Sequence, residues 1–425
     1  MIDPRAFLVS LFDAAVAAAD PQRSIERFLP HRPAGRTIIV GAGKGSAQMA
    51  RALEQRWDGP LGGVVVTRYG FGVECERIEI IEAAHPVPDE AGLEASRRLL
   101  ETVGDLTADD LVIALISGGG SALLPAPAGE LTLDDEVALN EALLGSGAPI
   151  SAMNTIRKHV SRIKGGRLAA AAHPARVVSL IVSDIPGDDP ALVASGPTVA
   201  GPGTREEALA AIKRYSIAVP KPVLAHIARP EATAPSPGDP RFAGHEHHVI
   251  ASAGVSLEAA QAEARRQGIR AVILSDAIEG EAREAARVHA AMAREVLFRD
   301  RPFSKPVVLL SGGETTVTVR GGGKGGRNSE FQLSLAMDID CLAGIFALAA
   351  DTDGVDGMQD NAGAFADAAT VARLRDMGLD PATLLDDNDA WTAFDAIGDL
   401  FSPGPTGTNV NDFRAILIDA GDIKR

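Results

Sequence analysis

The residues best suited to chemistry lie in a glycine-rich segment, SGGETTVTVRGGGKGGRNSEF, at positions 311–331. Five of the six residues at 321–326 are glycine, which loses more backbone entropy on folding than any other residue. Such a run makes sense where bare backbone must approach another group closely. With the cations Lys324 and Arg327 and the carboxylate Glu314, the segment offers the parts that an anionic, phosphorylated ligand needs. A flexible basic hairpin loop is the alternative.

A second glycine turn, GAGKGS at 41–46, stands between an expected strand and an expected helix. It misses the phosphate-binding motif GxxxxGK[ST], because Lys44 comes directly after Gly43 and only three residues past Gly41, and it misses the dinucleotide motif GxGxxG, because Ser46 replaces the third glycine. A lysine at a strand-to-helix turn, beside unpaired helix N–H groups, is still well placed to hold an anion. A lysine on a solvated loop is the alternative.

A third turn, SGGGSALL, follows the buried-type strand expected at 111–116. Its backbone N–H groups and two hydroxyls could cradle phosphates, and the alternative is an ordinary tight turn. The nucleotide-binding residues predicted in this turn are Ser117, Gly118, Gly119, Gly120 and Ser121. Those predicted in the glycine-rich segment are Gly323, Lys324, Gly325 and Gly326.

Cations gather in the segment MNTIRKHVSRIKGGR, which the pattern places within a helix at 151–172. The cluster is notable in a chain of net charge −16. Arg157 and Lys158 are candidates for binding a substrate carboxylate, because cationic N–H groups pair strongly with carboxylate oxygens. A solvated helix face is the favoured alternative for each cation taken singly.

Carboxylates follow two expected strands. Asp184 and Asp189 come after the strand at 177–182, and three aspartates at 351–356 come after the strand at 345–349. Mg²⁺ favours one or two carboxylates together with substrate phosphates, so Asp184 and Asp189 are candidate ligands. Helix caps and Asx turns are the common alternative for Asp-rich turns.

The elements that position these residues predict a parallel, doubly wound α/β sheet, because strands alternate with helices and end repeatedly in glycine turns. The Pro- and Ala-rich stretch at 220–240 marks the expected boundary between a domain at 1–235 and a smaller α/β domain at 240–425. Expected strands are 37–40, 63–67, 78–81, 111–116, 177–182, 248–251, 271–274, 307–310, 316–319, 345–349 and 415–418. Expected helices are 5–20, 47–57, 89–103, 131–144, 151–172, 257–267 and 281–296, with two short ones after 351.

Composition narrows the classes of function. At 425 residues, two domains are the natural expectation. The charge balance, 41 basic against 57 acidic residues, disfavours nucleic acid and anionic membranes as partners. Cys75 and Cys341 form no CxxC pair, and the motifs HExxH and GxSxG are absent, which disfavours zinc and serine hydrolases. No apolar run approaches the ~20 residues of a membrane span, so a cytoplasmic protein is expected.

Glycine turns, dispersed cations and paired carboxylates favour phosphoryl transfer, which requires positioning and charge neutralisation more than a nucleophilic side chain. The order of the motifs then carries a resemblance. In sequence, they are GAGKGS, HPVPD, SGGGSALL, MNTIRKHVSxIKGGRL, SDIPGDDxxxxASGPT, SGGETTVTV, GxGGRNxE, DTDGxDG and GPTGTNVND. From about residue 7 to residue 418, the chain resembles the class II glycerate 2-kinases, the MOFRL-domain family whose members have often been labelled hydroxypyruvate reductases.

The resemblance implies a Rossmann-like N-terminal domain, a smaller MOFRL domain and an active site in the cleft between them. It implies transfer of the γ-phosphoryl group of ATP, with Mg²⁺, to the 2-hydroxyl of D-glycerate. By this resemblance, Lys44 and Arg327 are the cations at the reacting phosphate and substrate. Asp184 or Asp189 would bind Mg²⁺ or orient the glycerate hydroxyl. A homodimer is compatible with the sequence.

Two rival functions remain open. An NAD(P)H-dependent hydroxypyruvate reductase would need nicotinamide binding, which the incomplete GxGxxG motif and the lack of a well-placed ribose-binding acid disfavour. A non-catalytic sensor of sugar acids would keep the cleft and lose the metal carboxylates, but both aspartate clusters are intact.

Overall fold

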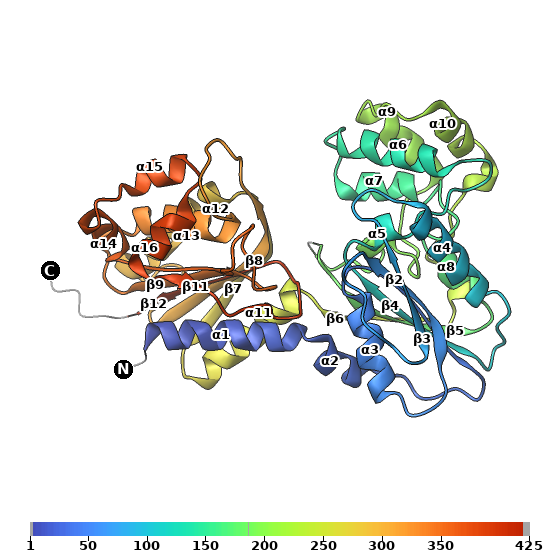
Figure 1. Ribbon diagram of the computed structural model, residues 1–425, viewed down its shortest axis with the longest axis horizontal. Helices are drawn as coiled ribbons and strands as arrows, with labels where there is room; N and C mark the ends of the chain where they lie inside the picture. The colour runs from blue at the N-terminus through green and yellow to red at the C-terminus, as the bar shows by residue number, and fades with distance from the viewer. Residues whose placement is uncertain (1–2, 186, 420–425) are drawn as a thin grey trace. The chain divides into compact units, whose positions relative to one another are not determined.

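The computed structural model describes residues 3–185 and 187–419. The chain forms two compact units, one of Pro21–Ile250 and the other of Met1–Asp20 together with Ala251–Arg425. Each unit contains a six-stranded sheet with its own helices (Figure 1). The predicted α/β class is confirmed for both units.

The sheet of the first unit has the strand order β3-β2-β1-β4-β5-β6. Neighbouring strands from β1 to β5 pair in parallel, and this is the strand order of the Rossmann fold. The order reverses between β1 and β4, and ligands of such sheets bind outside the carboxyl ends of the strands at that point. The strands are β1 Thr37–Ala42, β2 Gly62–Arg68, β3 Ile78–Ala83, β4 Leu111–Ser117, β5 Arg176–Val182 and β6 Glu246–Ala251.

Helices cover this sheet, which explains why its central strands are almost wholly apolar. Every residue of β4, with the sequence LVIALIS, is buried, as expected for a parallel strand covered on both faces. The helices of the unit are α2 Pro21–Ser24, α3 Ser46–Arg56, α4 Glu90–Thr102, α5 Gly120–Leu123, α6 Leu133–Leu144, α7 Ile150–Arg157, α8 Arg167–Ala171, α9 Arg205–Arg214 and α10 Lys221–Ile227. Its 3₁₀ turns are η1 Ile25–Phe28, η2 Val193–Ser195, η3 Pro230–Ala232 and η4 Pro240–Phe242.

A separate helical cluster, α6, α7, α9 and α10, gathers beside this sheet around its own apolar core (Figure 1). The single helix expected at 151–172 is wrong. It is divided into α7, which ends at Arg157, and α8, which begins at Arg167. Gly165 and Gly166, in the break before α8, adopt left-handed φ values of 64° and 81°, which an α-helix cannot contain. The backbone N–H of Arg162, in the break, donates to the carbonyl of Ala126 at 2.8 Å.

The sheet of the second unit is mixed, with the order β11-β10-β9-β12-β8-β7. Only β7 and β8 pair in parallel, and β12 is antiparallel to both β8 and β9. The strands are β7 Arg270–Glu281, β8 Val307–Thr316, β9 Ile345–Asp351, β10 Gly363–Asp367, β11 Leu400–Phe401 and β12 Asp412–Ile418. The helices are α1 Pro4–Ala19, α11 Ala253–Arg266, α12 Ala282–Arg299, α13 Arg327–Asp338, α14 Thr370–Asp376, α15 Pro381–Asp386 and α16 Ala390–Ile397.

The N-terminal helix α1 belongs to this second unit, where it lies along α11 and the sheet (Figure 1). The ring of Phe12 on α1 packs edge-on against Phe401 and Phe413, with centroids 5.0 and 5.8 Å apart. The Ser256 hydroxyl on α11 donates to the carbonyl of Ala15 at 3.0 Å. An apolar helix face at the start of the chain therefore completes a core built from residues 257–417.

Three sequence expectations differ from the structure in the second half. The strand expected to open the second domain, 248–251, is part of β6 and joins the first sheet, so the compact units do not coincide with 1–235 and 240–425. The separate strand expected at 316–319 is wrong, because β8 runs on to Thr316 and the N–H of Thr318 binds the Glu281 carboxylate at 3.0 Å. Strand β10, with the sequence GAFAD, was not predicted.

Truncating the Phe12 side chain tests the assignment of α1. Phe12→Ala should destabilise the second unit by about 3–5 kcal/mol, because it leaves a cavity among buried aromatic rings. Hydrogen exchange measured by mass spectrometry should accelerate in peptides covering α11 and β12 and stay unchanged in β4. The control is Phe298→Ala, since that side chain is 58% exposed on α12 of the same unit. Faster exchange in β4 alone would contradict the assignment.

Candidate active site

Hydrogen bonds lock together the two turns at the reversal of the first sheet. The N–H of Lys44, after β1, donates to the carbonyl of Gly118, after β4, at 2.9 Å. The N–H of Gly45 donates to the Ser117 hydroxyl at 2.9 Å, and the hydroxyls of Ser46 and Ser117 are 3.1 Å apart. The turns GAGKGS and SGGGS therefore form one rigid structure.

The glycines of these turns permit close approach by three polar side chains. Gly43 has φ 142°, and a Cβ there would overlap the Ser117 hydroxyl. A Cβ on Gly119 would lie 3.0 Å from the His85 ring and 3.1 Å from the Lys44 side chain. A Cβ on Gly118 would overlap the carboxylate of Asp184. The structure thus gathers Lys44, His85 and Asp184 around two adjacent glycines.

The hydrogen bonds of the two turns differ in what they leave available. The N–H groups of residues 43–46 are all bonded within the protein, to Val66 and Gly43 carbonyls as well as to Ser117 and Gly118. Unpaired helix N–H groups near Lys44 are nevertheless present, as expected, because those of Ala47 and Gln48 in the first turn of α3 have no acceptor in the described chain. The N–H groups of Gly118 and Gly119 likewise have no acceptor among the described residues. Unpaired N–H groups next to a lysine form a site suited to an anion.

The structure adds His85 to this site, beside Gly119. Burial lowers the pKa of its imidazole, and the nearby cations of Lys44 and Arg68 lower it further. The ring is therefore neutral at pH 7 and can exchange a hydrogen bond with a ligand without adding charge. The one signal in the sequence was its position in HPVPD, directly after β3.

A chain of side-chain hydrogen bonds connects Ser121 to Arg157. The hydroxyls of Ser121 and Ser195 are 2.9 Å apart, and the Ser195 hydroxyl donates to Asn154 Oδ1 at 3.0 Å. Arg157 Nη1 donates to the same oxygen at 3.2 Å and its Nε to Asn140 at 2.9 Å. Ser195 has φ 60°, a strained conformation of the kind that clusters at functional sites. Arg157 is thereby coupled to the SGGGS turn.

Lys158, the other predicted substrate cation, is engaged elsewhere. Its side chain is buried, and its ammonium donates to the carbonyls of Gly201 and Pro202 at 3.0 and 2.7 Å. Burial lowers the pKa of this ammonium. Two of its three donors therefore stabilise a loop of the protein itself, and Arg157 is the better candidate for a substrate carboxylate.

The two predicted Mg²⁺ ligands have different environments. Asp189 is exposed, and its Oδ1 accepts the N–H of Ala191 at 3.0 Å in an Asx turn. Asp184 is half-buried with its carboxylate against Gly118. Within 3–185 and 187–419, no three His, Cys, Asp or Glu side chains are grouped to hold a metal. A single carboxylate beside a phosphate site still meets the needs of Mg²⁺, so Asp184 suits this ion.

In the second unit, the glycine-rich loop packs against a turn at 387–389. The N–H groups of Arg320 and Gly321 donate to Asn388 Oδ1 at 2.7 and 3.1 Å. A Cβ on Gly321 or Gly323 would overlap this turn. The remaining bonds join the N–H groups of Gly322 to Asp387 Oδ1, Gly323 to the Asp387 carbonyl and Lys324 to Asp389 Oδ1, at 3.1, 3.0 and 2.9 Å. These glycines therefore permit contact within the chain.

In this loop, two backbone N–H groups predicted to bind the nucleotide remain available, and the one lysine contacts an aromatic ring. The N–H groups of Gly325 and Gly326 have no acceptor in the described chain. The ammonium of Lys324 lies 5.3 Å from the centre of the Trp391 ring, a cation–π contact. Any phosphate contact by the backbone N–H groups of this loop is thus confined to its last two glycines.

Arg327 opens α13 and is surrounded by carboxylates. Its Nε, Nη2 and Nη1 donate to Asp412, Asp351 and Glu314 at 2.6, 2.8 and 3.1 Å. Burial alone would lower the pKa of Arg327, but the three carboxylates outweigh burial and raise it. The pKa of Asp351 is raised by its own burial and by the neighbouring Asp353. The guanidinium is held rigidly, with its charge largely balanced.

The aspartates at 351–356 mainly support the backbone. Asp356 is buried and caps α13 by accepting the N–H groups of Asn328 and Ser329 at 2.9 and 2.8 Å. Asp353 accepts the N–H of Val355 at 2.8 Å. This second cluster therefore follows the helix-cap and Asx-turn alternative.

A buried histidine lies beneath the start of the glycine-rich segment. His289 Nδ1 is 2.8 Å from the carbonyl of Ala285, so this nitrogen carries the hydrogen, and Nε2 accepts the hydroxyl of Ser311 at 2.9 Å. Burial lowers the pKa of His289 to about 4. It is the single histidine of the second unit and is neutral at pH 7.

Known proteins resemble this chain over almost its whole length. Two family models match: one described as "Domain of unknown function (DUF4147)" over 7–228 and the MOFRL family over 307–412. A glycerate kinase of known structure from Thermotoga maritima matches with a TM-score of 0.89 and 39% identity, covering 97% of this chain and 99% of that one. The chain belongs to the glycerate kinase family. Its resemblance to this family, predicted from the motifs, is confirmed.

The relatives of this member of the glycerate kinase family carry the names of two different enzymes. D-Glycerate 2-kinase of Thermotoga maritima is 39% identical over 98% of this chain and 100% of its own length. A protein of Agrobacterium vitis, provisionally named a hydroxypyruvate reductase, is 52% identical over 98% of this chain and 95% of its own length. Family membership alone therefore does not decide which reaction the protein catalyses. Within the described part of the chain, no helix is long and apolar enough to cross a membrane.

His289 predicts an acid-sensitive second unit. The contribution of neutral His289 to the free energy of unfolding is fully present above the unfolded pKa of 6.5. It declines as pH falls toward the folded pKa of about 4, because the unfolded state takes up the proton first. Between pH 7.5 and pH 5, the free energy of unfolding should fall by about 2 kcal/mol. His289→Gln should remove this component.

The measurement is urea unfolding followed by Trp391 fluorescence in a Trp57→Phe background, so that the one remaining tryptophan reports on the second unit. The same pH dependence in wild type and His289→Gln would show that other groups cause it. The exposed His247→Gln, in the first unit, is the control.

Proposed function

We propose that this protein is an ATP-dependent D-glycerate 2-kinase, which transfers the γ-phosphoryl group to the substrate 2-hydroxyl. The observation that carries the proposal is the placement of the Lys44 side chain against Gly119, at the reversal of a Rossmann-type sheet, where the N–H groups of Gly118 and Gly119 have no acceptor among the described residues. Phosphoryl transfer needs fixed donors and a cation where charge develops, and little covalent chemistry from the protein.

Each residue of the site has a role in this proposal. The N–H groups of Gly118 and Gly119 hold phosphate oxygens, and Lys44 neutralises charge on the transferred group. Arg157, held by Asn154 and Asn140, takes the glycerate carboxylate. Asp184 suits Mg²⁺, which when bound would neutralise phosphate charge.

His85 and Arg327 complete the assignment. Neutral His85 is placed to hydrogen-bond a phosphate or hydroxyl oxygen next to Lys44. Arg327 stays a predicted catalytic cation by family resemblance, although three carboxylates already balance its charge. The names of the relatives from Thermotoga maritima and Pyrococcus horikoshii, which are glycerate 2-kinases, support the same reaction and the same substrates, ATP and glycerate.

The alternative, a hydroxypyruvate reductase, has support from the Agrobacterium vitis names but less from the geometry. In dinucleotide-binding sheets, the pyrophosphate sits on the N–H groups of the turn after β1. Here the N–H groups of the turn itself, 43–46, are bonded within the protein, which leaves for a pyrophosphate those of Ala47 and Gln48 in the first turn of α3, unbonded among the described residues. The end of β2 carries Arg68 where an acid would bind the ribose of NAD. An arginine there would suit NADPH, so both nicotinamides belong in the test.

Lys44 provides the sharpest functional variant. Lys44→Met should lower glycerate-dependent ADP release by at least about 10²-fold, because it removes a cation from the developing charge. The folded structure should survive, since the backbone of Lys44, not its ammonium, holds the turns together. Lys213→Met, an exposed lysine of the same unit, is the matched control.

The assay measures ADP release with ATP and Mg²⁺, with and without D-glycerate, and reads the phosphate position by phosphorus NMR. The kinase is expected to form 2-phosphoglycerate only when glycerate is present. If no ADP is released with or without glycerate, and NADH or NADPH is oxidised when hydroxypyruvate is supplied, the protein is the reductase and not the kinase. Near-normal turnover of Lys44→Met would remove Lys44 from the mechanism.

A further inference from the structure

A second cationic cavity lies in the first unit and shares no lining residue with the Lys44 site. Its volume is about 530 Å³, within the range of small-molecule sites. Three arginines and one carboxylate line it, with hydroxyls from the loop after η3. The lining residues are Arg162, Arg167, Ala170, Ala171, Thr233, Ala234, Pro235, Ser236, Asp239 and Arg241.

The arginines come from three segments that fold together. Arg162 lies in the break between α7 and α8, Arg167 is the first residue of α8, and Arg241 lies in η4. That break, which contains two left-handed glycines, separates the two helices, so Arg162 and Arg167 do not follow the spacing of one continuous helix. The feature that made the expected helix wrong thus creates one wall of this cavity.

The arginines of the cavity are incompletely compensated. Arg241 is paired with Asp239 through its Nε and Nη2 at 3.0 and 2.7 Å. Arg167 Nη2 donates to the carbonyls of Ala232 and Thr233 at 3.2 and 3.1 Å, but its Nε is buried with no hydrogen-bond partner in the described part of the chain. The exposed side chain of Arg162 has no partner among the described residues. One carboxylate therefore faces three guanidinium groups.

Without a bound anion, this cluster of arginines lowers the stability of the folded protein. Burial lowers the pKa of Arg167, and the like charge of Arg241 lowers it further. A buried donor left unpaired costs roughly 1–3 kcal/mol. This cluster persists in a chain of net charge −16, whose other charges could have compensated it.

We propose that this arginine cavity binds a small phosphorylated metabolite, through its phosphate group, at a site separate from the Lys44 turn. Guanidinium groups present paired N–H donors that match phosphate oxygens. Thr233 and Ser236 supply hydroxyls on the same wall. The volume exceeds that of inorganic phosphate, which leaves room for the organic part of the ligand.

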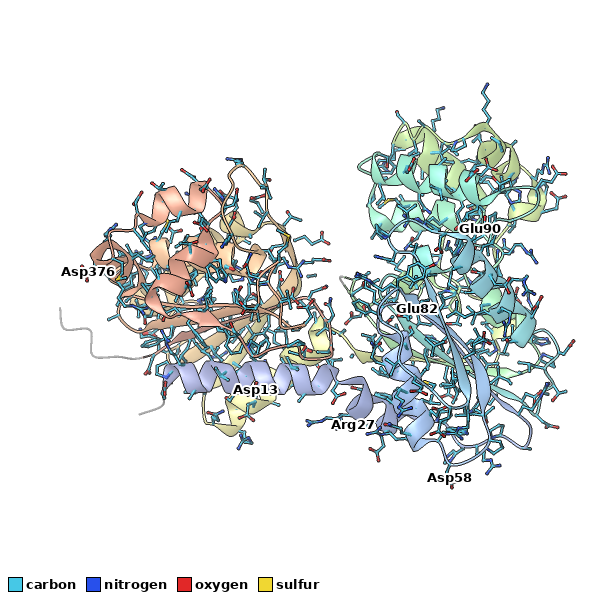
Figure 2. All side chains as sticks on the ribbon, in the orientation of Figure 1. Asp13, Arg27, Asp58, Glu82, Glu90 and Asp376 are labelled. Carbon is cyan, nitrogen blue, oxygen red and sulfur yellow. The ribbon has the colours of Figure 1, made fainter. Side chains whose placement is uncertain are left out.

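The test uses calorimetry with pyrophosphate on the full-length Lys44→Met protein, in which the other phosphate site is weakened. Arg162→Glu should lower the affinity at least about tenfold, because it reverses a charge at the cavity. This side chain makes no hydrogen bond among the described residues, so the fold should be kept. The control is Arg27→Glu, an exposed arginine on η1 of the same unit (Figure 2).

Each outcome decides the proposal. Pyrophosphate binding that falls in Arg162→Glu and persists in Arg27→Glu at 0.15 M salt supports the cavity. No binding to Lys44→Met, or equal binding with and without Arg162, overturns it. Equal losses in both charge reversals would indicate a general electrostatic effect and also overturn it. Malonate, titrated in parallel, should bind more weakly, and the reverse order would contradict the choice of a phosphate ligand.

Discussion

The hydrogen bonds between the turns after β1 and β4 are the constraint on which the proposed active site depends. Ser117 and Gly118 accept the N–H groups of Gly45 and Lys44, and this fixes the direction from which Lys44 approaches Gly119. Each bond contributes only about 1 kcal/mol of net stability. These bonds serve mainly to position the site. They occupy the backbone N–H groups of the turn after β1, while the N–H groups of Gly118 and Gly119 in the turn after β4 have no acceptor among the described residues.

The two glycine-rich segments also differ in whether their backbone N–H groups are bonded within the described chain. In the turn after β4, glycines bring Asp184, Lys44 and His85 close to unpaired N–H groups. In the loop at 320–326, glycines bring the backbone against the turn at 387–389, and five N–H groups are bonded there. Glycines therefore serve the proposed ligand site in one case and chain packing in the other.

Sequence reasoning succeeded where the determinants were local. Strand ends followed by glycine turns predicted the α/β class and placed Lys44, Ser117 and Asp184 at carboxyl ends of parallel strands. It failed where a distant partner decided the outcome. Asn388 lies 67 residues from Gly321, whose N–H it accepts, and no local pattern reveals such a pairing.

Other errors have the same origin. The apolar face of α1 predicts a helix, but not that the face packs on Phe401 and Phe413 near the other end of the chain. The sequence around β6 predicts a strand, but not which sheet it joins. His85 has an unremarkable local context, and its site is apparent only when Gly119 and Lys44 are placed beside it.

The most direct test of the account is hydrogen exchange, with mass spectrometry, in the presence and absence of Mg²⁺ and a non-hydrolysable ATP analogue. If the N–H groups of Gly118 and Gly119 hold phosphate oxygens, exchange in the peptide covering 117–123 should slow sharply on binding. Protection confined to 320–326, with 117–123 unchanged, would contradict the central claim that the turn after β4 is the phosphate site.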